Sequence, residues 1–237
     1  MQAYVDKQIL PSKIIEGAYE INFYGNKINC VFKNSKYFEF RSEALIELKL
    51  FKEELIKLKP TVILFSGGEP LLQKQAMIEL IDFCKKMKIK IALKTNGTKS
   101  DVLKYFLQKS FFDIIVFDLI TSQENFKKIT KAGTFFESAE KTYFEIIESI
   151  NLLKEYDKEV DIIFRTLIVP GSVYRKEVFL ELAKIIKDLK CVWELEKFNP
   201  EDNAELFKKI EPPSNQFLET LKRIILENYS NMNIELV

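Results

Sequence analysis

Segments typical of β-strands alternate with segments typical of α-helices along almost the whole chain, and this order restricts the fold more than any other feature. Short connections between such segments predict parallel strands joined by right-handed crossovers. Six such units are too few for a closed eight-unit barrel, so an open, partial barrel and a doubly wound sheet both fit. The predicted strands are 19–24, 61–66, 89–94, 112–118, 159–168 and 191–198. The predicted helices are 43–58, 71–87, 99–109, 137–156, 175–189 and 214–229.

The chain shows no repeat, linker or low-complexity segment, so one domain over residues 1–237 is expected. Its core would cover about 19–200, and a helix and strand would follow over 213–237. The terminal strand, at 232–237, and a further strand at the start of the chain would be additions at sheet edges.

Glycines follow several of the predicted strands closely. Because parallel α/β folds bind ligands at the carboxyl ends of their strands, these glycines predict a ligand-binding edge. The alternative explanation is that each glycine serves a turn that needs a positive φ. The residues concerned are Gly25, Gly67, Gly68, Gly97 and Gly171.

The segment Val62–Pro70 is the most informative of these strand ends. An apolar run ends in Ser-Gly-Gly, followed by a carboxylate and a proline that can open a helix. Two adjacent glycines would let a ligand approach the backbone and leave N–H groups free to bind it. The carboxylate of Glu69 can hold a cation or an amine. We therefore expect a site for a small molecule with an ammonium group.

Composition excludes several classes of function. Lysine and arginine total 36 against 35 acidic residues, and the lysine runs at 85–90 and 127–131 are typical of solvated helix ends and loops, which argues against nucleic-acid binding. No apolar stretch reaches the ~18 residues that span a bilayer, and residues 1–11 do not form a signal peptide. We predict a cytoplasmic protein without a membrane partner. Histidine is absent, which removes the commonest general base and zinc ligand.

The segments at the ends of five successive strands resemble those of the radical S-adenosylmethionine (SAM) superfamily, and within it the branch that activates glycyl-radical enzymes. The resemblance extends from about Glu20 to Pro200 and implies a partial (βα)6 TIM-like barrel. The matching segments are Ser66–Leu72, Leu93–Gly97, Phe117–Leu119, Phe164–Gly171 and Trp193–Phe198.

This resemblance implies SAM as the cofactor and assigns roles by position. Three groups of residues would hold the amino group, the ribose and methionyl part, and the adenine of SAM. A further pair would lie at the barrel mouth, where an arginine suits the carboxylate of SAM, and aromatic residues would form pocket walls or simply pack in the core. The residues for the amino group are Gly67, Gly68 and Glu69, those for the ribose and methionyl part are Thr95 and Asn96, and those for the adenine are Val169 to Gly171. The pair at the barrel mouth is Asp118 and Arg165, and the aromatic residues are Phe32, Tyr24 and Phe198.

The family's cluster motif, Cys-x3-Cys-x-aromatic-Cys, is altered in this chain. The loop Asn26–Asn34 keeps the middle cysteine, Cys30, and the aromatic Phe32, but Asn26 and Lys33 stand in the two other cysteine positions. A [4Fe-4S] cluster is held by thiolates, which neither an amide nor a protonated amine replaces. We therefore expect no cluster by the family's ligation, with Cys30 as the single motif cysteine.

The remaining features of the motif region agree with this loss. Cys84 and Cys191 are predicted to be buried structural thiols at the opposite end of the strands. The family's Asp-Leu-Lys after the fourth strand is Asp118-Leu119-Ile120 here. Lys33 is predicted to occupy part of the cluster volume, with its ammonium paired to Glu69 or Asp118.

Three functions remain open at this point. The first is a catalytically degenerate protein that binds SAM or another nucleotide, or acts as a partner of an active homologue or of a glycyl-radical enzyme. The second is a working activase that cleaves SAM to a 5′-deoxyadenosyl radical, with a cluster held by Cys30 and ligands from a partner chain. The third is a non-radical enzyme that uses Glu69, Asp118, Lys94 and Lys33 as acid–base groups.

Overall fold

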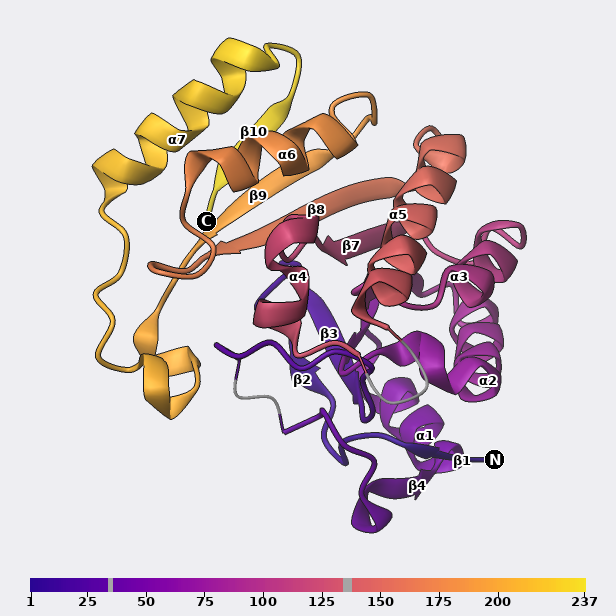
Figure 1. Cartoon of the computed structure of the whole chain (residues 1–237). Coiled ribbons are helices and arrows are strands. Elements are labelled where there is room, and N and C mark those ends of the chain that lie inside the picture. Colours follow the sequence, from indigo (N-terminus) through magenta and orange to yellow (C-terminus); the bar gives the residue numbers. More distant parts are fainter. Residues whose placement is uncertain (34–35, 134–137) are drawn as a thin grey trace. The chain divides into compact units, whose positions relative to one another are not determined.

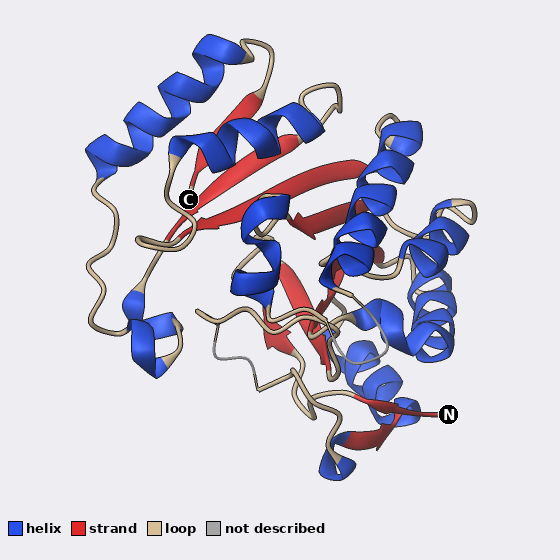
Figure 2. Ribbon diagram, in the orientation of Figure 1, coloured by secondary structure: helices blue, strands red, loops and turns tan. Residues whose placement is uncertain are grey.

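The computed structural model describes residues 1–33, 36–133 and 138–237. Within these ranges, it describes only the backbone of residue 202. Helices and strands alternate along the chain (Figures 1 and 2). The described residues form two compact units. The first contains residues 1–27, 36–95 and 99–116, and the second contains residues 28–33, 96–98, 117–133 and 138–237.

The first unit is built around parallel strands β3, β5 and β6, with β2 antiparallel to β3 at the edge. Strands β1 and β4 form a separate antiparallel pair. The elements are β1 (Gln2–Tyr4), β2 (Leu10–Pro11), β3 (Ala18–Phe23), η1 (Ser42–Ala44), β4 (Leu45–Glu47), α1 (Leu48–Leu58), β5 (Val62–Gly67), η2 (Pro70–Gln73), α2 (Lys74–Lys86), β6 (Lys90–Thr95), α3 (Ser100–Leu107) and the start of β7 (Ile114–Asp118).

The core of the first unit follows from its apolar pattern. Residues Ile63 to Phe65 of β5 are all fully buried, as expected for a parallel strand covered on both faces. Helix α1 buries Leu48, Phe51 and Leu55, which recur at helical spacing on one face.

Besides residues 28–33 and 96–98, the second unit contains the last two residues of β7 and the described residues that follow them. Strands β8, β9 and β10 are parallel neighbours in that order, and helices α6 and α7 pack side by side (Figure 1). Its elements are α4 (Gln123–Thr130), α5 (Ala139–Tyr156), β8 (Asp161–Ile168), α6 (Lys176–Ile186), β9 (Val192–Lys197), η3 (Pro200–Asp202), η4 (Glu205–Phe207), α7 (Asn215–Asn228) and β10 (Asn233–Leu236).

The two faces of β8 and β9 have different environments. Trp193 is fully buried, packs on Phe179 of α6 with ring centroids 6.4 Å apart, and donates from Nε1 to Oγ1 of Thr166 at 3.0 Å. Since side chains alternate along a strand, the neighbours Arg165 and Glu194 lie on the opposite face from this helix-covered layer. That face carries the charged residues of the candidate site.

Each predicted strand and helix has a counterpart, with three differences. The predicted helix 43–58 is wrong over its first five residues, which form the 3-10 turn η1 and strand β4, because β4 pairs with β1. Helix α4 was not predicted and replaces an expected loop. The first residue of the predicted helix 137–156 lies outside the described residues. The predicted terminal strand is confirmed as β10, and the single domain stays a prediction.

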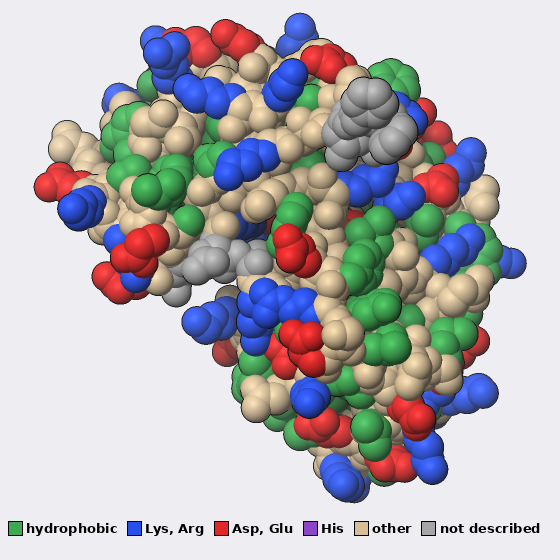
Figure 3. Space-filling model, turned by 60° about the horizontal axis from the view of Figure 1, so that its bottom comes forward, with side chains coloured by type: hydrophobic (Ala, Val, Ile, Leu, Met, Phe, Trp, Pro, Cys, Tyr) green, Lys and Arg blue, Asp and Glu red, His purple; other side chains and the backbone are tan. Residues whose placement is uncertain are grey.

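The surface carries charges of both signs. Figure 3 shows lysine and arginine side chains interspersed with aspartate and glutamate on the face it displays. The lysines at 85–90 and 127–131 are exposed, as predicted. Within the described ranges, no helix is both long enough and apolar enough to cross a membrane.

Candidate functional site

The two glycines after β5 are required by the protein's own backbone. Gly67 has a φ of +97°, and a Cβ added there would lie 2.5 Å from the carbonyl oxygen of Phe23. A Cβ on Gly68 would collide with the carbonyl oxygen of Gly25 and lie 2.7 Å from that of Tyr37. Close packing within the first unit thus explains why both positions require glycine.

The N–H groups of this turn are also used internally, which corrects the expectation that they are free for a ligand. The N–H of Gly68 donates to the carbonyl of Phe23 at 2.8 Å, and that of Glu69 donates to the carbonyl of Gly25 at 2.7 Å. Both bonds attach the turn to the end of β3.

Glu69 and Thr95 contact each other in the first unit. The carboxylate of Glu69 is fully buried and accepts the hydroxyl of Thr95, which is 2.9 Å from each of its oxygens. It also accepts the N–H of Leu71 at 3.1 Å, which caps the 3-10 turn η2. The binding of a ligand amine by Glu69 stays a prediction.

In the second unit, the altered cluster loop is fixed to the C-terminal end of α4. The N–H groups of Asn29 and Val31 donate to the carbonyls of Thr130 and Ile129 at 2.8 and 2.9 Å. Cys30 is buried in this loop. Phe32 is buried as well, and its ring packs edge-on against that of Phe207, so core packing accounts for this residue.

Lys33 pairs with Asp118, one of the two predicted partners. Its Nζ lies 3.4 Å from Oδ2 of Asp118, the last residue of β7. The negative charge of Asp118 raises the pKa of Lys33 above its usual value of 10.5, with further contributions from Cys30 and Glu196, although burial acts in the opposite direction. Lys33 therefore remains an ammonium.

Arg165, the predicted partner of a ligand carboxylate, is paired with carboxylates of its own chain. Its Nε lies 2.7 Å from Oε2 of Glu194, and its Nη2 lies 3.4 Å from Oε2 of Glu196. Burial raises the pKa of Glu194, and the charges of Glu235 and Glu196 add to this effect, while Arg165 opposes it. Sequence reasoning missed Glu194 and Glu196, whose alternate spacing on β9 places them on the same face as Arg165.

Two other predicted residues make internal contacts. Oδ1 of Asn96 accepts the N–H and the hydroxyl of Thr98 at 3.0 and 2.7 Å. Val169 is fully buried, and its N–H and carbonyl pair with those of Val173 at 2.9 Å to close the turn after β8. Both residues stabilise strand-end turns of the second unit.

The three cysteines lie in different segments of the chain. Cys84 is buried in α2 of the first unit, whereas Cys30 and the partly buried Cys191 belong to the second. Burial raises the pKa of Cys84 to about 12 and that of Cys191 to about 11, so both thiols stay protonated at neutral pH. In the described part of the chain, no group of three or more cysteine, aspartate or glutamate residues is placed to hold a metal ion.

The donors at the three motif positions do not fit a [4Fe-4S] cluster. They are the amide of Asn26, the thiol of Cys30 and the ammonium of Lys33. Cluster irons bind anionic sulfur ligands, and Lys33 is held as a cation by Asp118.

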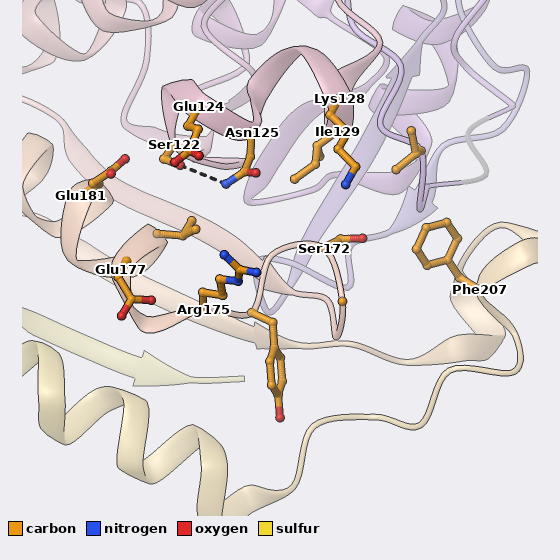
Figure 4. A pocket seen from close by; sticks show the side chains of 14 residues that line it. Ser122, Glu124, Asn125, Lys128, Ile129, Ser172, Arg175, Glu177, Glu181 and Phe207 are labelled. Carbon is orange, nitrogen blue, oxygen red and sulfur yellow. Dashed lines mark hydrogen bonds between the residues drawn. The ribbon is translucent and has the colours of Figure 1, made fainter.

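A cavity of about 830 Å³ lies in the second unit, between α4 and the segment that leads into α6 (Figure 4). Asn125 of α4 and Ser122, the residue before this helix, share a hydrogen bond of 3.5 Å at one side, and Arg175 faces them from the other. Sequence reasoning missed this cavity because it missed α4. The remaining lining residues are Val31, Glu124, Lys128, Ile129, Gly171, Ser172, Tyr174, Glu177, Val178, Glu181 and Phe207.

Comparison with protein-family models identifies the class of this chain. The model of the radical SAM superfamily matches residues 28–183, about two thirds of the sequence. The chain therefore belongs to the radical SAM superfamily.

Its relatives indicate the activase-like branch. A Methanocaldococcus jannaschii protein provisionally named a glycyl-radical enzyme activating enzyme is 27% identical over 218 residues, which cover 92% of this chain and 88% of that protein. The pyruvate formate-lyase-activating enzyme of Clostridium pasteurianum is 27% identical over 61% of this chain and 58% of its own length.

Solved structures confirm the fold class. A radical SAM methyltransferase from Sphaerobacter thermophilus has a TM-score of 0.69 at 14% identity, covering 93% of this chain and 66% of that chain. SuiB of Streptococcus suis bound to SAM has a TM-score of 0.59 at 15% identity, over 90% of this chain and 49% of that one. The predicted partial TIM-like barrel of the radical SAM type is thus confirmed.

Proposed function

We propose that this chain is a catalytically degenerate radical-SAM-fold protein, which binds SAM or another nucleotide and acts through a protein partner without cluster chemistry. The observation that carries this proposal is the ion pair between Lys33 and Asp118. It fixes a positive charge at a position where cluster binding needs a thiolate.

The same ion pair argues against a non-radical enzyme that uses Lys33 as a general base. Such a lysine must lose its proton near neutral pH, which requires a lowered pKa. The pKa of Lys33 is raised instead, chiefly by Asp118.

A protein partner is supported by the cavity of the second unit. Its floor includes the buried side chains of Ile129 and Val178, and its rim carries exposed charges of both signs. Leu206, next to the lining residue Phe207, is 89% exposed. An apolar centre with a polar rim is the usual anatomy of a protein interface. The names of the relatives favour a glycyl-radical enzyme as the partner. An active homologue is the alternative partner, and we propose that the protein acts in the cytoplasm without nucleic acid or membrane.

Anaerobic reconstitution with iron and sulfide, followed by iron counting and calorimetry with SAM, tests this proposal. We expect no stably bound iron after desalting, together with measurable nucleotide binding. About four irons per chain, the content of one [4Fe-4S] cluster, together with cleavage of SAM on reduction, would contradict the proposal and establish a working activase with unusual ligands. If the chain binds neither iron nor nucleotide, only the partner role of this proposal would remain.

A further inference from the structure

A groove of about 450 Å³ lies in the first unit, where β1, β4 and the beginning of α1 adjoin one another (Figure 1). This β4 groove is lined by Gln2, Lys7 and seven residues of the segment 43–54. The residues predicted to hold SAM are not among its lining residues. It therefore needs an explanation of its own.

The lining of the β4 groove is partly apolar, and the first unit leaves some of it uncovered. Ile46 and Phe51 are buried, whereas Leu45 and Leu50 are 40% and 56% exposed. Leu50 belongs to α1 but lies outside the buried stripe of that helix. A single exposed leucine is ordinary. Two that line one groove together with a buried phenylalanine form an apolar surface of the kind that binds a partner.

The charged residues of the β4 groove are mainly acidic. Its lining holds three glutamates, Glu43, Glu47 and Glu54, and one lysine, Lys7. Among the described residues, none of these four forms an ion pair, whereas other charged residues of α1 do. The groove thus has an excess of negative charge, which attracts a cationic partner and opposes an acidic one. The same charge argues against nucleic acid and anionic membranes as occupants.

We propose that the β4 groove binds a segment of a partner protein in which apolar side chains are flanked by lysine or arginine. The apolar side chains contact Leu45, Leu50 and Phe51, and the cationic ones pair with the glutamates. Apolar contact at the centre supplies affinity, and the surrounding charges supply specificity and a fast association rate. The proposal is independent of the proposed function, since it involves neither the motif positions nor the cavity of the second unit.

Fluorescence anisotropy of the full chain with three sets of short labelled peptides tests this docking surface. Peptides of the first set alternate lysine with leucine, isoleucine, valine or phenylalanine. The second set has glutamate in place of lysine, and the third has serine in place of each apolar residue. We expect the tightest peptide of the first set to bind at least about tenfold more tightly than any peptide of the others. Its affinity should fall when the ionic strength is raised from about 0.05 to 0.5 M, because salt screens exposed charges.

Single variants of α1 locate the binding in the β4 groove. Leu50→Ser should weaken binding of the tightest peptide at least about tenfold. Its control is Ile56→Ser, because Ile56 is 48% exposed on the same helix but does not line the groove. Glu54→Lys should weaken binding to a similar extent, whereas Glu53→Lys, at the neighbouring position outside the groove, should have a smaller effect. Thermal unfolding checks that each variant is folded.

Two results would overturn the proposal. One is binding of the glutamate or serine peptides as tightly as the first set. The other is a loss of binding in Leu50→Ser that is no larger than in Ile56→Ser. Sedimentation of the full chain examines a second copy as the alternative occupant, and a dimer that dissociates in Leu50→Ser but not in Ile56→Ser would also overturn the proposal. None of these results affects the iron and nucleotide measurements that test the proposed function.

Discussion

At position 33 the chain carries an ammonium where its family's motif has a cysteine. The exchange alters the charge as well as the donor atom, since a thiolate becomes a cation. Asp118 lies 3.4 Å from this cation and stabilises it. Lys33 thus makes a specific contact within the second unit, and a reversal at this position alone would remove the ammonium that pairs with Asp118.

The ion pair between Lys33 and Asp118 should contribute stability over a defined pH range. Because the folded pKa of Lys33 lies above its unfolded value of 10.5, the contribution is complete below about pH 10.5 and is lost as the pH rises through the folded pKa. We expect Lys33→Met to lose about 1 kcal/mol or less of unfolding free energy at pH 8. The difference from the unaltered chain should shrink as the pH rises above 10.5 and through the raised pKa of Lys33.

Urea unfolding at several pH values measures this difference. Lys49→Met is the control, since Lys49 forms an exposed helical pair with Glu53. A difference between the unaltered chain and Lys33→Met that shrinks already below pH 10.5 would contradict the prediction.

Replacing a glycine that is required by close packing should lower the unfolding free energy more than replacing a glycine that is required only by its positive φ. Gly68→Ala forces a Cβ into the carbonyl of Gly25 and should cost about 1–3 kcal/mol of unfolding free energy, as overpacking does. Gly171 has a φ of +77° with no atom within 4 Å of an added Cβ, so Gly171→Ala should cost only the backbone strain of about 1 kcal/mol. Chemical denaturation compares them, and a larger loss for Gly171→Ala would refute the backbone contact as the reason for Gly68.

At the scale of elements, the turn after β5 connects several parts of the first unit. Gln73, the last residue of η2, donates from Nε2 to the carbonyls of Tyr4 and Tyr24 at 2.8 and 2.9 Å. Its Oε1 accepts the N–H of Tyr4 at 2.8 Å. One side chain therefore joins η2 to β1 and to the end of β3.

Replacing Gln73 by glutamate tests this connection. Gln73→Glu keeps an acceptor for the Tyr4 N–H but places a carboxylate against two carbonyl oxygens, so it should lower the unfolding free energy by about 2 kcal/mol. Hydrogen exchange at the Tyr4 amide should accelerate as well. Gln75→Glu, at an exposed position of α2, is the control. Equal exchange rates in the two variants would show that Gln73 does not hold β1.

The sequence predicted the parallel strands well because their apolar runs and following glycines are strong local signals. It failed at 43–47 because the pairing of β4 with β1 depends on residues about 40 positions apart. It assigned Glu69, Thr95, Asp118 and Arg165 to a site but could not show that Glu194 and Glu196 occupy the guanidinium of Arg165. That contact depends on the register between β8 and β9.

At the scale of the whole molecule, the cluster motif draws on both units. Asn26 belongs to the first unit, whereas Cys30 and Lys33 belong to the second. Family membership covers residues 28–183 and so includes parts of each unit. The two altered motif positions, Asn26 and Lys33, therefore lie one in each unit.

Restoring the cysteines provides a test at this scale. We expect Asn26→Cys with Lys33→Cys to bind about four irons per chain after anaerobic reconstitution, because three thiolates then match the family's motif. Either single variant should bind no stable cluster. Iron content and the visible absorption of the cluster are the measurements, and a double variant that folds but binds no iron would show that more than these two positions was lost.

The packing of Gly67 and Gly68 against Phe23 and Gly25 also limits what the Ser-Gly-Gly-Glu-Pro motif indicates about enzymatic activity. A protein that had ceased to bind any ligand would still need both glycines in order to fold. Selection for a stable barrel is then sufficient to preserve this part of the family's signature long after the chemistry has gone. Genome surveys that count radical SAM enzymes by Ser-Gly-Gly-Glu-Pro alone would include such descendants, and the cysteine positions are the ones that distinguish them.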